Sequence, residues 1–204
     1  MIDEEGGYVY FPPSQSTNQL ERISIGAHVR ETRAVAPQSG TFAHGAWKNG
    51  ELWIVLNNYH LYSYDPIANT WTDEHTYANR AMVQAHENDA SDDVYVWVTD
   101  ETFHAYDTVA GTDTVLAGFP IAADLGGNGQ IQFVPSNEGL EYGFIYAVSG
   151  CSGAPRIYSI SADTWSTLTD PHNNGGCNGH ATYDTLRHRL YVTDASDQVW
   201  WYQY

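Results

Sequence analysis

Lysine is almost absent from this chain of 204 residues: Lys48 is the only one. Lysine and arginine together number eight, against 25 aspartates and glutamates, and the formal charge is −17. A charge of this sign repels phosphate backbones and anionic lipid surfaces, so we expect no nucleic acid partner. The shortage of lysine and the wealth of Tyr, Trp, Asn and Gly favour a secreted or extracellular protein.

Long apolar runs are missing as well. No stretch approaches the ~18 apolar residues of a membrane-spanning helix, so we predict no membrane span. Residues 1–5 are acidic where a signal peptide has a basic front, so the protein either stays inside the cell or has lost its signal. The chain also has no Gly-x-Ser-x-Gly elbow and no phosphate-binding loop, which leaves two large enzyme classes without support.

Cysteine occurs only twice, as Cys151 and Cys177. A disulfide between them would close a loop of about 26 residues and stabilise the fold by roughly 3 kcal/mol. We expect this bridge, which in turn supports export from the cell. Two free buried thiols are the alternative.

A repeated phrase of about 45 residues dominates what the sequence does contain. Each copy has a short aromatic and β-branched strand, a turn and a second such strand, and the first strands of the copies cover residues 8–10, 52–55, 94–97, 144–148 and 190–192. No helical periodicity accompanies them. A period of this size built of strands alone predicts an all-β fold, a β-propeller of about five blades of three to four antiparallel strands. We expect one domain, 1–204, with units at approximately 1–40, 41–81, 82–129, 130–179 and 180–204.

The two terminal units are incomplete in this interpretation. The first unit lacks its innermost strand and the last lacks its outermost strand. Either the ring closes with trimmed terminal blades, or a partial propeller is completed by another chain. A closed ring is favoured because stranded blade faces would expose a large apolar patch.

Two stretches resemble kelch repeats. Residues 61–71 combine Tyr64-Asp65-Pro66 with Trp71 and are followed by Arg80, and residues 157–165 repeat the pattern in part, ending at Trp165. The resemblance implies a propeller that serves mostly as a binding platform, although some kelch proteins are oxidases. We expect Trp71 and Trp165 to act as wedges between blades, because a Trp buries a large area between two sheets. Trp200 and Trp201 are adjacent, so their side chains should point to opposite faces.

Long polar side chains recur at the start of the innermost strands. The position holds His44, Gln84, Gln132 and His180 in successive units. In a propeller these residues would lie near the axis. They either line a water-filled channel or form a ring that binds a ligand or ion.

A second set of candidates falls on the rim that carries the loops between the second and third strands. It consists of amide, aromatic and carboxylate residues, namely Asn57, Asn58, Tyr59, Asp100, Glu101, Asp194 and Asp197. Such groups suit a neutral sugar, which needs hydrogen bonds to its hydroxyls and a flat ring for stacking. Ordinary polar turn chemistry is the alternative.

These patterns predict a non-catalytic, lectin-like module that binds carbohydrate on the loop rim. One alternative is a protein-interaction or assembly subunit completed by another chain, including a homo-oligomer. A second is a glycoside-processing enzyme, suggested by the excess of carboxylates, although the sequence singles out no catalytic residue. We expect no cofactor and leave metal ligands unassigned; calcium is the ion considered, because the Asp-rich loops offer oxygen ligands.

Overall fold

A computed structural model describes residues 1–3, 6–14, 17–40, 45–85, 91–98, 102–118, 130–134, 144–148, 156–167, 181–184, 186–193 and 199–203. Every regular element within these ranges is a β-strand, and every pairing with a described register is antiparallel. The all-β, antiparallel prediction is therefore confirmed. No helix in the described part is long and apolar enough to cross a membrane.

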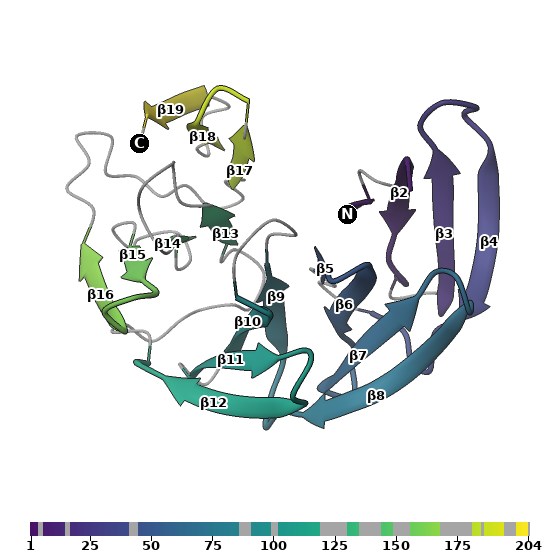
Figure 1. Cartoon of the computed structure of the whole chain (residues 1–204), viewed down its shortest axis with the longest axis horizontal. Coiled ribbons are helices and arrows are strands. Elements are labelled where there is room, and N and C mark those ends of the chain that lie inside the picture. Colours follow the sequence, from purple (N-terminus) through teal and green to yellow (C-terminus); the bar gives the residue numbers. More distant parts are fainter. Residues whose placement is uncertain are drawn as a thin grey trace. The chain divides into compact units, whose positions relative to one another are not determined.

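The strands form five sheets, which we number in chain order (Figure 1). The first sheet contains β1 (Ile2–Asp3), β2 (Tyr8–Phe11), β3 (Gln19–Ser24) and β4 (Arg30–Val35). The second contains β5 (Gly45–Lys48), β6 (Glu51–Val55), β7 (His60–Asp65) and β8 (Thr70–Thr76). The third contains β9 (Ala81–Gln84), β10 (Asp93–Val98), β11 (Phe103–Asp107) and β12 (Thr112–Leu116). The fourth contains β13 (Gln130–Val134), β14 (Phe144–Val148), β15 (Arg156–Ser159) and β16 (Thr164–Thr167). The fifth contains β17 (Ala181–Asp184), β18 (Arg189–Thr193) and β19 (Val199–Gln203).

The expectation that the first unit lacks its innermost strand is wrong. The two-residue strand β1 pairs with β2, with Ile2 opposite Val9 and Asp3 opposite Tyr8. So short a strand carries no visible sequence pattern, which explains the error. Among the described residues the fifth sheet has three strands, as expected.

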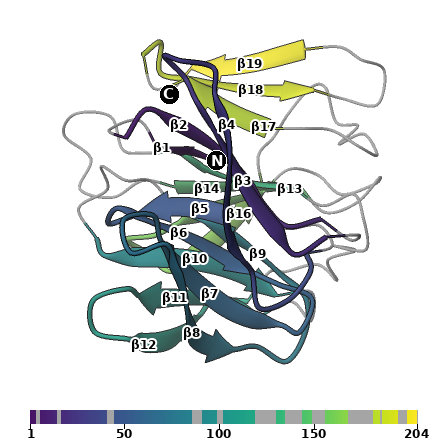
Figure 2. The ribbon, with the colours of Figure 1, turned by 90° about the vertical axis from the view of Figure 1, so that its right-hand side faces the viewer.

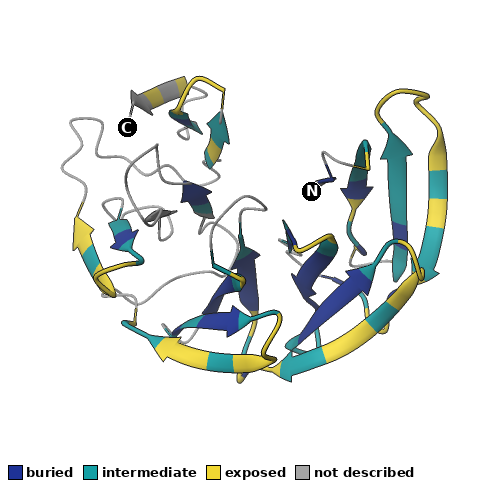
Figure 3. Ribbon diagram, viewed as in Figure 1, coloured by how far each residue is buried: buried dark blue, intermediate teal, exposed yellow. Residues whose placement is uncertain are grey.

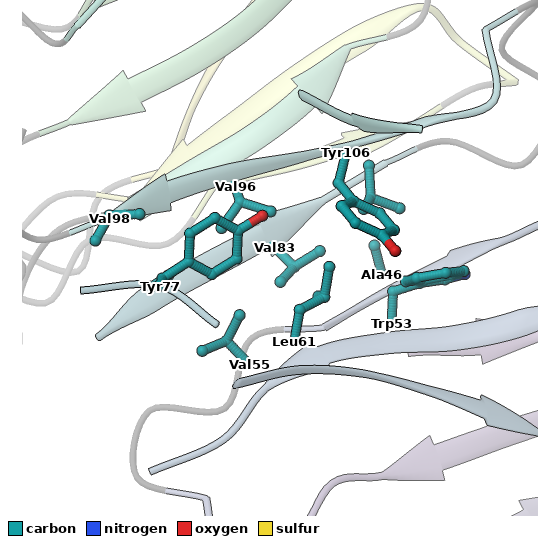
Figure 4. Packing of buried hydrophobic residues seen from close by; sticks show 11 residues of the cluster. Ala46, Trp53, Val55, Leu61, Tyr77, Val83, Val96, Val98 and Tyr106 are labelled. Atoms are coloured by element: carbon teal, nitrogen blue, oxygen red, sulfur yellow. The ribbon is translucent and has the colours of Figure 1, made fainter. Parts of the chain in front are cut away.

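The chain divides into two compact units. The first comprises Met1–Glu87, Asp92–Val98 and His104–Thr114, and the second comprises Asn88–Ser91, Thr99–Phe103 and Val115–Tyr204. In the first unit the main core lies between the second and third sheets, where Trp53, Val55 and Leu61 pack on Val83 and Val96 (Figure 4). In the second unit Val134 of the fourth sheet packs with Leu190 of the fifth.

Burial follows strand position within each sheet. Four consecutive residues of β7 are buried, as are five of β10, because these middle strands are covered on both faces. The fourth strands β4, β8 and β12 carry mixed exposed and half-buried residues (Figure 3). Figure 2 shows the second sheet with β5 to β8 side by side and β8 at its edge. The aromatic and β-branched composition of the inner strands fits this burial.

The hairpin between the third and fourth strands repeats in four sheets. Each hairpin has an alanine followed by one residue with positive φ, and the latter residues are His28, Asn69, Gly111 and Asp163, with φ of 55°, 59°, 67° and 49°. In the second sheet the Asp65 carboxylate accepts hydrogen bonds from the main-chain N–H groups of Ile67 and Ala68 at 2.7 and 2.9 Å. Asp107 accepts the equivalent pair in the third sheet. Equivalent positions in the four sheets can therefore be found by counting residues from the positive-φ residue.

The turn between β5 and β6 buries the only lysine. Asn49 and Gly50 both have positive φ, as a two-residue hairpin turn of this type requires. Lys48 precedes them and is only 1% exposed. The indole N–H of the buried Trp53 donates to the Lys48 main-chain oxygen at 3.1 Å and so fixes the start of the turn.

Candidate functional site

A tryptophan closes the junction between the first and second sheets. Trp71 lies two residues after Asn69, and its indole N–H donates to the main-chain oxygen of Ala34 at 3.2 Å. The side-chain oxygen of Asn69 accepts two hydrogen bonds, from the Tyr64 hydroxyl at 2.7 Å and from the Ala34 N–H at 2.9 Å. The Tyr64 and Trp71 rings are in contact, with 4.9 Å between their centroids. We call this arrangement the Trp lock.

The same set of hydrogen bonds recurs within the second compact unit, between Ala117 and the hairpin of β15 and β16. Trp165 lies two residues after Asp163 and donates to the Ala117 oxygen at 2.7 Å. The Asp163 carboxylate accepts from the Tyr158 hydroxyl at 2.6 Å and from the Ala117 N–H at 2.7 Å. As expected for a wedge, Trp71 lies between the first and second sheets.

The junction between the second and third sheets departs from this pattern. Two residues after Gly111, at the place of the Trp, stands Asp113. Ala34 and Ala117 lie six residues after His28 and Gly111, and the residue six positions after Asn69 is His75. The apolar pair of Trp and Ala is thus replaced by Asp and His on the two facing strands.

Asp113 is the centre of a polar cluster at this junction. Its Oδ1 accepts the Tyr77 hydroxyl at 3.1 Å, and its Oδ2 lies 2.8 Å from Nδ1 of His104 and 3.9 Å from Nε2 of His75. The side chains of Asp113 and His104 are 13% and 12% exposed, whereas that of His75 is 35% exposed. His75 is therefore the part of the cluster that solvent reaches most easily. We call His75, Tyr77, His104 and Asp113 the Asp113 cluster.

A β-bulge brings β8 to this cluster. Leu61 lies opposite His75 while Tyr62 lies opposite Asp73, so Glu74 is an extra residue on β8. An extra residue moves every following side chain to the other face of its sheet. His75 and Tyr77 consequently share a face with Leu61, which packs against the third sheet. β4 has a register shift at the equivalent place, between the pairs Gln19–Val35 and Glu21–Thr32.

A second polar row crosses the same junction. The Ser63 hydroxyl donates to Oε1 of Glu74 at 2.8 Å, and the Tyr106 hydroxyl donates to Oε2 at 3.3 Å. Nearby, the Asn49 amide donates to Asp92 at 3.1 Å and to Thr108 at 2.8 Å. The second and third sheets are therefore joined by polar contacts beside their apolar core.

Burial among carboxylates alters the acidity of several groups here. The pKa of Tyr77 is raised, first by burial and then by the Asp113 charge. The pKa of Tyr106 is raised to about 12 by burial and by the charge of Glu74. Burial also raises the pKa of Glu51, with smaller contributions from Asp65 and Glu74. Both tyrosines therefore remain hydrogen-bond donors at neutral pH.

The predicted rim residues Asn57 and Asn58 hold the β6–β7 turn together. The Asn57 amide donates to the Ser39 hydroxyl at 3.1 Å, and the Asn58 amide donates to the Tyr62 hydroxyl at 2.8 Å. Tyr59 has positive φ, a half-buried side chain and a main-chain oxygen that accepts the Tyr77 N–H at 2.9 Å. Of the three, Tyr59 is the residue joined to the Asp113 cluster, through this main-chain hydrogen bond to Tyr77.

The two described residues of the predicted axial set are half-buried. Gln84 lies opposite Tyr95 on β10, and Gln132 donates its amide to the Phe133 oxygen at 2.7 Å. The remaining predicted positions lie outside the described residues: His44, Asp100, Glu101, His180, Asp194, Asp197, Cys151 and Cys177. Trp201 is exposed, and the side chain of Trp200 lies outside the described part.

Sequence reasoning missed the Asp113 cluster. The hairpins have to be aligned at their positive-φ residue for the cluster to be found. In that alignment Asp113 stands where other hairpins have Trp71 or Trp165, and His75 stands where they have an alanine. Within the described ranges, no group of three or more His, Cys, Asp or Glu side chains is placed to hold a metal ion. No family model matches the chain, and no curated protein matches it.

Proposed function

We propose that this chain is a secreted, kelch-like β-propeller of about five blades that acts as a non-catalytic, lectin-like carbohydrate-binding module. Five antiparallel sheets of three or four strands support the propeller. The repeated hairpin with a Trp two residues after Asn69 and Asp163 supports the kelch resemblance. Contacts between successive sheets within each compact unit agree with stacked blades.

The observation that carries the binding function is the replacement of the Trp lock by the Asp113 cluster. Two facing positions have changed together from apolar to polar, and the polar groups include a carboxylate, two imidazoles and a Tyr hydroxyl. The polar groups stand beside an apolar core that is otherwise intact, and the more exposed His75 gives the cluster a group that a ligand can contact.

A sugar suits the chemistry of this cluster. Carboxylate and imidazole groups hydrogen-bond to hydroxyls, and the half-buried Tyr59 is the aromatic residue that would offer a flat face to a sugar, whereas Tyr77 and Tyr106 are buried. The His75 ring contacts the Tyr77 ring at 4.8 Å between centroids and the Tyr106 ring at 6.0 Å. We assign His75 and Tyr59 to the accessible edge of the site and Asp113 to its inner wall.

A glycan-array screen tests this function, run with calcium and again with a chelator. Selective binding to one sugar class is expected, with loss of binding in His75→Ala and Asp113→Asn. Asp73→Asn is the matched control, because Asp73 lies on β8 before the bulge and pairs with His60 instead. A blank array in both conditions, or binding that survives both cluster variants, would overturn the proposal. Loss of binding in the chelator would indicate that calcium takes part.

A further inference from the structure

Asn49 and Gly50 form an Asn-Gly pair in the two-residue turn between β5 and β6. An asparagine loses its amide most readily before glycine, because glycine has no side chain to shield its main-chain nitrogen. That nitrogen attacks Cγ of the asparagine, the Cγ–Nδ2 bond breaks, and ammonia leaves with the proton that the glycine nitrogen gives up. Water then opens the succinimide ring to aspartate or isoaspartate. The turn therefore contains the chemical groups that deamidation requires.

The third sheet holds the amide that would leave. Nδ2 of Asn49 donates to Oδ1 of Asp92 at 3.1 Å and to Oγ1 of Thr108 at 2.8 Å. Thr108 in turn donates its hydroxyl proton to the main-chain oxygen of Asp92 at 2.7 Å, and its main-chain N–H to the same oxygen at 3.1 Å. All three residues belong to the first compact unit. Nδ2 can therefore leave as ammonia only after both of its hydrogen bonds are broken.

The two acceptors distinguish an amide from a carboxylate. An ionised Asp92 has no proton to give, and the Thr108 hydroxyl proton is already donated to the Asp92 main chain. A carboxylate at position 49 would therefore face two oxygens with no donor between them, and one of the two is charged. An isoaspartate would also lengthen the main chain in a turn that has positive φ at both of its residues. The site accepts asparagine and disfavours both products of deamidation.

We propose that Asn49 is a deamidation site gated by the contact between the second and third sheets. While Asp92 and Thr108 hold its amide, the residue stays an asparagine. Opening of this contact releases Nδ2 and lets the Gly50 nitrogen react, and the carboxylate that results prevents the contact from forming again. The change is irreversible because ammonia is lost. The inference does not depend on the proposed carbohydrate function.

The rate of deamidation at Asn49, in folded and unfolded protein, tests the gate. The chain has four Asn-Gly pairs, which begin at Asn49, Asn128, Asn174 and Asn178. Peptide mass spectrometry follows each pair by the mass gained when an amide becomes an acid. In urea all four should react at similar rates, because unfolding removes the contacts that distinguish them. In native buffer Asn49 should react at least about ten-fold more slowly than it does in urea.

A variant of one acceptor tests the role of the hydrogen bonds. Thr108→Val removes an acceptor and keeps the shape of the side chain, so Asn49 should deamidate about five-fold faster in native buffer. Thr112→Val is the matched control, because it makes the same change on β12 and leaves both bonds of Asn49 in place. Circular dichroism verifies that each variant is folded. A folded Thr108→Val that reacts at the wild-type rate, or a native Asn49 that reacts as fast as in urea, would overturn the proposal.

An exchange of amide and carboxylate tests the product, and it decides the question if Thr108→Val does not fold. Asn49→Asp imitates the aspartate product and should lower the midpoint of urea unfolding. Adding Asp92→Asn places an amide opposite the new carboxylate and should restore most of that loss. Both are measured in NaCl, which screens the net charge of the chain. An unchanged midpoint in Asn49→Asp, or a loss that Asp92→Asn does not correct, would contradict the proposal.

Discussion

The hydroxyl of Tyr77 donates a hydrogen bond to Oδ1 of Asp113 across 3.1 Å. Tyr77 follows β8 of the second sheet and Asp113 belongs to β12 of the third, so this bond joins two sheets. It exists because a bulge at Glu74 turns Tyr77 toward the third sheet. The equivalent place in the two Trp locks is held by an indole that donates to a main-chain oxygen. The stability of the junction between the second and third sheets should therefore depend on Tyr77 and Asp113, whereas each Trp lock should depend on its indole N–H.

A double-mutant cycle on Tyr77→Phe and Asp113→Asn measures this bond. Each single variant should lower the free energy of unfolding by about 1–3 kcal/mol, because both groups are buried and lose a partner. The pair should show a coupling of roughly 1 kcal/mol in urea unfolding. Additive effects would mean that the hydroxyl and the carboxylate do not interact.

The Trp locks should each depend on the indole N–H. Trp71→Phe and Trp165→Phe retain an aromatic ring but leave a main-chain oxygen without its donor, so each should cost about 1–2 kcal/mol. Trp201→Phe is the control, since that ring is half exposed and its change should stay within about 0.5 kcal/mol. Equal effects at all three positions would argue against the lock.

Gly111 should accept asparagine better than alanine. Its φ of +67° disfavours residues with a side chain, so Gly111→Ala should cost about 1 kcal/mol. Asparagine tolerates this conformation and already occupies the equivalent Asn69 position. A Cβ on Gly111 would lie 3.7 Å from the Tyr106 hydroxyl. An asparagine there could therefore accept a hydrogen bond from Tyr106, as Asn69 does from Tyr64. Gly111→Asn should therefore unfold within about 0.5 kcal/mol of wild type in urea. A variant as unstable as Gly111→Ala would contradict this.

Deprotonation of Glu51 should lower the free energy of unfolding as the pH rises. Burial raises its pKa in the folded chain above the ordinary value of 4.5, so the folded state holds the proton more tightly than the unfolded state. The resulting stabilisation is fully present below pH 4.5 and is lost as the pH passes through the raised pKa. Glu51→Gln should flatten this part of a pH series of urea unfolding. An unchanged slope would show that Glu51 is equally acidic in both states.

Salt should stabilise the protein. With a formal charge of −17, the folded chain repels itself, and ions reduce that repulsion. We expect the thermal midpoint to rise with NaCl. Choline chloride of equal ionic strength should act in the same way, because screening does not depend on the identity of the cation. A rise seen with calcium chloride alone would instead indicate a specific calcium site.

The strands and the Trp wedges were the features that sequence could predict. Alternation at residues 60–64 and the Asp65-Pro66 turn mark β7 and its hairpin directly, because both are local signals. The Trp71 wedge follows from the size of its side chain. Strand β1 could not be found, since two residues carry no periodicity.

The candidate site was harder to predict because it depends on a partner strand. Asn57 and Asn58 look like binding residues by type, yet their amides are used by Ser39 and Tyr62 within the first compact unit. His75 and Tyr77 reach Asp113 only because the bulge at Glu74 reverses their face. Sequence alternation alone would place them on the opposite side of the sheet.

The burial of Lys48 has a consequence for chemistry at the protein surface. Because the only lysine side chain is 1% exposed, the folded chain offers reagents that acylate lysine almost no target. Lysine cross-linking and ubiquitin transfer to lysine would both depend on local opening that exposes this side chain. The reactivity of Lys48 with an amine-directed label, measured at this residue and apart from the α-amino group, would therefore report on opening of the β5–β6 turn.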